Sequence, residues 1–114
     1  MTNIVTVGVS SLDEVKDRLA AAFRGEPQGS RISFLSVEQM WKTLNPKRAA
    51  ILRAMTGQGK LSIREVARRM GRDVKAVHGD VHALLAAGII DRAGRGVVFP
   101  YDGVHVNFML GMAA

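Results

Sequence analysis

Apolar residues follow two different spacings in the first third of the chain, and each spacing predicts one type of element. Short β-branched runs over residues 4–9 and 31–35 predict two strands. Between them, Ser11 and Glu14 have the spacing of a helix-capping box. The apolar positions that follow recur at steps of three or four residues and predict a helix that ends near residue 24. These positions are Leu12, Val15, Leu19, Ala22 and Phe23. This part of the chain is therefore expected to be strand, helix, strand.

Helix-start signals punctuate the middle of the chain. Ser36 precedes Gln39 in a second capping box, so a short helix is expected over 37–44, with Trp41 in the core. Asn45 is expected to cap a helix that begins at Pro46 and ends before Gly57. A third capping box opens the next helix, and a left-handed glycine is expected to close it; the residues are Ser62, Glu65 and Gly71.

A third helix of this region is expected over residues 73–87, capped by Asp73. Its apolar positions recur at helical steps and are Val74, Val77, Val81, Leu84 and Leu85. Residues 89–92 and 97–99 flank a glycine-containing turn and predict a β-hairpin. The alternation of apolar and polar residues over 101–110 predicts a last strand.

This order of elements predicts the fold. Helix, turn, helix, short break, helix and hairpin form the sequence of a winged helix-turn-helix. We therefore expect a mostly helical α+β protein, with a strand-helix-strand extension over 1–44 and a winged helix-turn-helix domain with a C-terminal strand over 45–114. The length of 114 residues fits a single compact unit.

Charge is unevenly distributed and favours an anionic partner. The net charge is +6, but residues 1–45 hold five basic and five acidic side chains. Residues 47–75 hold nine basic side chains against two acidic ones, a local charge of +7. A basic block of this density, next to a neutral segment, is typical of a surface that binds phosphates.

The sides of the predicted helix 73–87 indicate where DNA would bind. If its apolar residues face the core, Lys75, His78, Gly79 and His82 lie on or near the opposite side and are expected to reach the major groove. Gly79 either permits close approach to the duplex or is a tolerated helix glycine. Phosphate or minor-groove contacts are assigned to the remaining basic candidates, which are Arg64, Arg68, Arg69, Arg72, Arg92 and Arg95.

Other chemistry has little support in the sequence. The i, i+4 pair His78 and His82 matches the spacing of metal ligands, but it is only two ligands, and DNA contact or plain surface explains it as well. There are no cysteines, which excludes disulfides, thiolate metal sites and a cysteine nucleophile. Phosphate loops, nucleophile elbows and facing carboxylates are absent, so neither catalysis nor a metal or other cofactor is expected.

A family resemblance supports the same assignment. The valine and leucine spacing of Val77, Val81 and Leu84, followed by Ala87-Gly88-Ile89-Ile90-Asp91, resembles the end of the recognition helix in MarR-like and ArsR-like regulators. More narrowly, residues 61–78 together with 98–102 look like a prokaryotic family of predicted MarR-like DNA-binding proteins, some of them encoded beside toxins. The chain departs from full-length MarR proteins in its short wing loop and in lacking a second C-terminal helix for dimerisation.

Three functions are compatible with these features. The first is a transcriptional regulator, expected to be a repressor, that binds double-stranded DNA as a homodimer with helix 73–87 in the major groove and wing 89–99 on the backbone or minor groove. The second, which the resemblance implies, is an antitoxin that binds a toxin protein and autoregulates its operon. The third, a winged helix that binds only protein, leaves the basic face unexplained.

The location and the role of the N-terminal part are expectations of the same kind. A cytoplasmic protein without a membrane partner is expected, since no apolar run is long enough to cross a bilayer and no secretory signal is evident. Val5, Val7 and the apolar residues of the first helix are expected to be buried against a second copy rather than against the last strand or a toxin. Removal of residues 1–29 is then expected to leave a folded, largely monomeric module.

Overall fold

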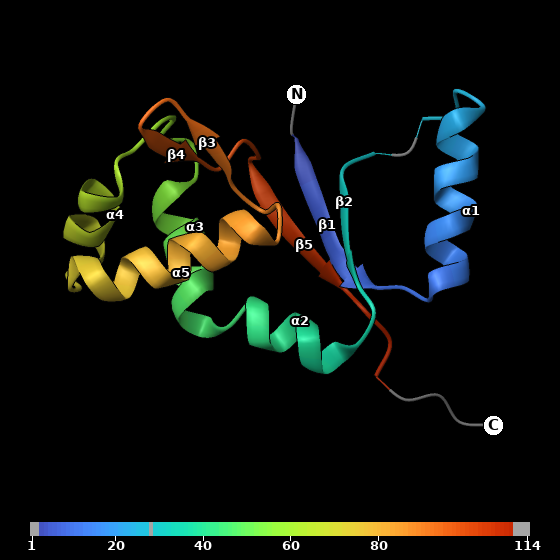
Figure 1. The fold of residues 1–114 in the computed structure, drawn as a ribbon, viewed down its shortest axis with the longest axis horizontal. Helices are drawn as coiled ribbons and strands as arrows, with labels where there is room; N and C mark the ends of the chain where they lie inside the picture. Colours follow the sequence, from blue (N-terminus) through green and yellow to red (C-terminus); the bar gives the residue numbers. More distant parts are fainter. Residues whose placement is uncertain (1–2, 28, 111–114) are drawn as a thin grey trace.

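Two groups of elements make up the protein in the computed structural model, which describes residues 3–27 and 29–110. A three-stranded parallel sheet lies between an isolated helix at one end of the molecule and a cluster of helices with a hairpin at the other (Figure 1). The expected α+β class is confirmed, and helices hold more residues than strands.

The parallel sheet joins the two ends of the chain. Its central strand is β1 (Ile4–Val9), which pairs on one side with β2 (Arg31–Phe34) and on the other with β5 (Gly103–Asn107). All three strands were expected, although β5 is shorter than the predicted run over 101–110. The pairing of β1 with β5 had been an alternative to the favoured expectation, which was cover by a second copy.

One face of this sheet is apolar and the other is polar. Val7 is in register with Ile32 on β2 and with Val106 on β5, so the three side chains share a face. Helix α2 (Val37–Thr43) contacts β1 and β2, and Val5 and Val7 are fully buried. The chain itself therefore covers these two valines, and the expectation that a second copy covers them was wrong.

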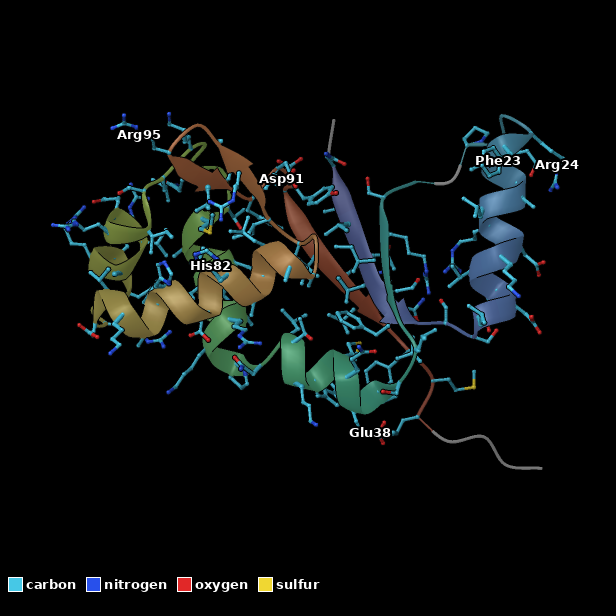
Figure 2. The ribbon with its side chains drawn as sticks, in the orientation of Figure 1. Phe23, Arg24, Glu38, His82, Asp91 and Arg95 are labelled. Atoms are coloured by element: carbon cyan, nitrogen blue, oxygen red, sulfur yellow. The ribbon has the colours of Figure 1, made fainter. Side chains whose placement is uncertain are left out.

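Helix α1 (Leu12–Phe23) forms as predicted but has no buried residue. The side-chain oxygen of Ser11 accepts a hydrogen bond from the Glu14 amide at 3.1 Å, so this cap is confirmed. Leu19 and Phe23 are 57% and 85% exposed, since α1 stands beside β2 and apart from the other helices (Figures 1 and 2). The periodicity thus located the helix correctly, but its apolar side chains are not covered by the described part of the chain.

The prediction that Trp41 lies in the core was wrong. Ser36 caps α2 as expected, through a bond from the Gln39 amide. In this helix of seven residues, however, it is Met40 that is fully buried, whereas Trp41 is 50% exposed. The next residue of a helix points about 100° away. Trp41 therefore leaves the core and packs edge-on against Phe108, with 5.4 Å between the ring centroids.

Three helices follow at the other end of the molecule: α3 (Pro46–Met55), α4 (Ile63–Met70) and α5 (Val74–Ala86). Asn45 and Ser62 cap α3 and α4 as predicted, and Gly71 ends α4 in the left-handed conformation with φ 63°. Asp73 precedes α5 but makes no side-chain capping bond, which corrects its predicted role. Val74 was expected to face the core and is instead 41% exposed.

The predicted hairpin is present as β3 (Asp91–Ala93) and β4 (Gly96–Val98). Its first strand begins later than expected because Ile89 and Ile90 are buried in the core, where they link α5 to the hairpin. Leu61, just before α4, exchanges two backbone hydrogen bonds with Val97 at 2.9 and 2.8 Å. This exchange fixes the hairpin against the start of α4.

A single cluster of buried side chains contains residues from both sides of the predicted boundary at residue 45. Val5, Phe34 and Met40 belong to it together with Ile51 and Leu84. The boundary itself stays a prediction. Because buried side chains from both sides of residue 45 pack in one cluster, the sheet and the helices share a hydrophobic core.

Candidate nucleic-acid interface

The orientation of α5 is set by one buried side. Val77, Val81 and Leu84 are fully buried against the core. On other sides of the same helix, Lys75, His78 and Gly79 are exposed, and His82 is partly buried. The residues predicted to contact DNA from this helix therefore lie outside the core, and three of them are open to solvent.

Gly79 has no structural reason to be glycine. A Cβ atom built at this position would meet nothing within 4 Å, and its φ is not positive. Glycine inside a helix costs roughly 0.5–1 kcal/mol relative to alanine. An exposed glycine that packing does not require fits a position where a partner approaches the backbone closely.

The two histidines of α5 lie side by side. Their Nε2 atoms are 3.1 Å apart, and their ring centroids are 4.1 Å apart; Figure 2 labels His82 on this helix. Among residues 3–27 and 29–110, no group of three or more histidine, cysteine, aspartate or glutamate side chains is placed to hold a metal ion. Because tetrahedral zinc sites use three or four protein ligands, the pair alone does not make one.

Two of the predicted phosphate-binding arginines of α4 are engaged with a glutamate. Glu65 accepts hydrogen bonds from Arg68 and also from Arg69, whose Nε is 3.0 Å away. The bond from Arg68, followed by that from Arg69, lowers the pKa of Glu65 to about 2. Arg64 is exposed and takes part in no ion pair found in the described part of the chain. Of the three, Arg64 is therefore the one free to meet a phosphate.

Arg72 lies inward rather than on an open surface. Its Nη2 donates to Asp80 at 2.9 Å, and its side chain is only 22% exposed. Arg48 donates to the other oxygen of the same carboxylate at 3.0 Å. Burial raises the pKa of Asp80, but the hydrogen bonds and charges of Arg72 and Arg48 outweigh it and lower the pKa overall.

This ion triad was missed by the sequence analysis. Arg48 also donates to the backbone carbonyls of Lys42 and Thr43 at 2.9 and 3.0 Å, so the triad links the end of α2 to α3, α5 and the α4–α5 turn. Asp80 is next to the buried Val81. Its position at the border of the apolar side of α5 was the one feature of the sequence that could have indicated the ion triad.

The hairpin carries a second basic area. Arg92 and Arg95 are both exposed, and Figure 2 shows Arg95 at the outer end of the hairpin. A Cβ atom built at Gly94 would lie 3.2 Å from the Lys60 Nζ atom. Lys60 therefore lies over the hairpin turn. Sequence reasoning missed this lysine because the Leu61–Val97 bridge that brings it there joins distant segments.

The protein is an α+β protein in which one side of α5 exposes Lys75, His78 and Gly79 and the hairpin exposes Arg92 and Arg95. The chain belongs to the HVO_A0114 family, whose model matches residues 43–106, more than half of the chain. Searches of curated proteins and of solved structures gave no match. Within the described residues, no helix is long and apolar enough to cross a membrane.

Replacement of Asp80 by asparagine tests the ion triad. Loss of the carboxylate leaves two partly buried guanidinium groups without a counter-charge, so the free energy of unfolding is expected to fall by about 2–3 kcal/mol. Because the pKa of Asp80 is lowered on folding, its contribution is present above the unfolded-state value of about 3.9 and is lost as the pH falls.

Urea unfolding at several pH values measures this effect. The stability difference between the wild type and Asp80→Asn should be large near neutral pH and shrink towards about pH 3. Asp91→Asn, at an exposed carboxylate, is the matched control and should change stability by less than about 0.5 kcal/mol. Equal, pH-independent effects of both substitutions would contradict the role of the triad.

Proposed function

We propose that this protein is a sequence-specific DNA-binding transcription regulator, acting as a repressor, with a winged helix-turn-helix architecture. The observation that carries the proposal is α5, whose buried side fixes it in the fold while Lys75, His78 and Gly79 are presented to solvent. Helix α4, the Gly71 turn and α5 supply the helix-turn-helix, and β3–β4 supplies the wing. Membership of the HVO_A0114 family does not itself assign this function.

The dimensions of α5 suit a major groove. A helix of 13 residues is about 20 Å long at 1.5 Å per residue. The major groove of B-DNA is about 12 Å wide and admits one helix. With α5 in the groove, Lys75, His78 and His82 are the proposed base-edge contacts, and Gly79 allows the helix backbone to approach.

The proposed phosphate contacts are refined by the ion pairs. Three of the proposed phosphate contacts have no acidic partner among the described residues, namely Arg64, Arg92 and Arg95. Lys60, which lies at the hairpin turn, is added to these proposed contacts. Arg68 and Arg69 contribute less because Glu65 offsets part of their charge. Arg72 acts through Asp80 by holding α5 in place rather than by touching DNA.

Lys75→Ala and Arg95→Ala separate base reading from phosphate binding. Lys75→Ala should relax base preference at one or two positions of the site, whereas Arg95→Ala should weaken all sequences alike and lower the salt slope by about 1. For about four phosphate contacts, wild-type affinity should fall about a hundredfold between about 50 and 200 mM salt. Fluorescence anisotropy with a selected site and a random duplex gives all three quantities.

Two results would refute this assignment. One is an affinity for DNA that does not change with salt concentration, which would show that binding does not depend on phosphate contacts. The other is an identical effect of Lys75→Ala and Arg95→Ala on binding to the selected and random duplexes, which would show that the two residues do not have separate roles in base reading and phosphate binding.

Gly79→Ala is expected to change stability and binding in opposite directions. Alanine fits the open space at this position and should stabilise the helix by about 0.5–1 kcal/mol. The added methyl group should nevertheless weaken DNA binding, because it stands between the helix and the duplex. Ala76→Gly, at an exposed position of the same helix, is the control and should destabilise the protein without lowering intrinsic affinity. Unchanged or tighter binding by Gly79→Ala would show that the glycine is merely tolerated.

The proposed regulator is a homodimer, and α1 offers a surface for the second copy. Leu12 and Phe23 lie on this helix and are 57% and 85% exposed, and Met109 beyond β5 is 73% exposed. A second copy would double the length of DNA that is read and make the site palindromic.

Phe23→Ser tests this surface without removing β1, whose valines belong to the core. Deletion of residues 1–29 is a poor test because it would expose that core. In analytical ultracentrifugation, Phe23→Ser should dissociate the dimer and weaken operator binding, whereas Arg24→Gln at the neighbouring exposed position should not. A monomeric wild type would refute the homodimer. The exposed apolar side of α1 would then be proposed to bind a different protein, such as the toxin of a toxin–antitoxin pair.

A further inference from the structure

A second polar cluster joins α1 to β2 and to the end of β1, elements that lie away from α4 and the hairpin (Figure 1). It is formed by Ser10, directly after β1, Ser33 on β2, Arg18 on α1 and Arg31 on β2. The DNA-binding proposal does not use these residues. They adjoin the carboxyl end of β1, where the chain leaves a central strand whose two neighbours lie on opposite sides. In open sheets with parallel strands this is the usual place for a ligand.

Both arginines bond to the same two hydroxyl groups. Arg18 Nη2 is 2.7 Å from Ser33 Oγ and 3.1 Å from Ser10 Oγ. Arg31 reaches the same two oxygens, with Nε 3.3 Å from Ser33 Oγ and Nη2 3.2 Å from Ser10 Oγ. Ser10 is 2% exposed and Ser33 is partly buried, so the Ser10 hydroxyl lies at the base of the cluster rather than on open surface.

The charge of this cluster is not balanced. Neither Arg18 nor Arg31 belongs to any ion pair found among residues 3–27 and 29–110. The serine hydroxyl groups are neutral, so they satisfy hydrogen bonds without offsetting two guanidinium charges that are held together. An oxyanion would offset them and accept paired N–H bonds from a guanidinium fork.

The sheet leaves room for this arrangement at Gly8. A Cβ atom there would lie 3.0 Å from Arg31 Nη2 and 2.4 Å from the Asn107 carbonyl oxygen. Any larger residue would therefore collide with the β5 backbone and crowd the guanidinium. The glycine serves both the close pairing of β1 with β5 and the position of Arg31.

A groove between α1 and β2 leads to the arginines. Its volume is about 410 Å³, and Val15, Leu19 and Ala22 of α1 form its apolar wall, opposite Arg31 and Ser33. We infer that this groove binds a small organic anion whose carboxylate or phosphate group lies against Arg18 and Arg31 and whose apolar part lies along α1. The inference does not rest on DNA binding.

Calorimetric titration of the full chain with octanoate, acetate and inorganic phosphate tests this site, with sodium chloride at matched ionic strength as the blank. Octanoate should bind more tightly than acetate because only octanoate covers the apolar wall. Arg18→Gln and Arg31→Gln should each weaken octanoate binding about tenfold or more, since a charged hydrogen-bond partner is lost. Arg24→Gln, at the C-terminal end of α1 and paired with Glu26, is the matched control and should bind like the wild type.

A second measurement uses the wild type and so does not depend on the folding of the variants. Octanoate should protect Arg18 and Arg31 from modification by phenylglyoxal, as read by peptide mass spectrometry, while Arg24 reacts at an unchanged rate. Protection of all three arginines alike, or of none, would overturn the inference. Equal affinities for acetate and octanoate would also overturn it, because the apolar wall would then take no part. The phosphate titration shows which of the two head groups binds more tightly.

Discussion

The carboxylate of Asp80 is the point on which the arrangement of the helices depends. It accepts from Arg48 on α3 and from Arg72 in the turn before α5, and Arg48 in turn holds the last carbonyls of α2. Apolar packing of Val77, Val81 and Leu84 decides which side of α5 is buried, but it does not fix rotation or register as sharply as three directed charges do. The buried side chains therefore select the side of α5 that faces the core, and the ion triad on its border fixes the rotation and register of the helix.

The rest of the molecule divides into two chemically different ends. At one end, ion pairs hold Arg72 inward and reduce the charge that Arg68 and Arg69 present. The exposed basic residues of α4, α5 and the hairpin region that take part in no ion pair found among the described residues are Lys60, Arg64, Lys75, Arg92 and Arg95. At the other end, the hydrogen-bond partners shared by Arg18 and Arg31 are the uncharged hydroxyl groups of two serines. Each end presents cations, but only at the second end do they face an apolar wall, formed by Val15, Leu19 and Ala22 of α1.

Local signals in the sequence were sufficient to locate the elements. Four of the five side-chain caps that were predicted form, because each needs only residues within one turn of its helix; they are those of Ser11, Ser36, Asn45 and Ser62. The failures involve contacts between distant segments. Trp41 was expected in the core, but its position depends on how α2 packs against the sheet. Arg72 was read as surface charge because its partner Asp80 belongs to the next helix, and Lys60 was overlooked because a bridge to Val97 carries it to the hairpin. Hydrophobic periodicity located α1, but periodicity gives only the side of a helix that is apolar, not what covers it.

The parallel pairing of β1 with β5 imposes an order on folding. Ile4 is in register with Gly103, so nearly the whole chain separates two strands that must meet. Contacts of such long range carry a large loop-closure cost and form late. The helices between them make mainly local contacts and can collapse as soon as they are synthesised. During translation β1 can pair with β2 and pack against α2 early, but its other edge stays unpaired until β5 has emerged.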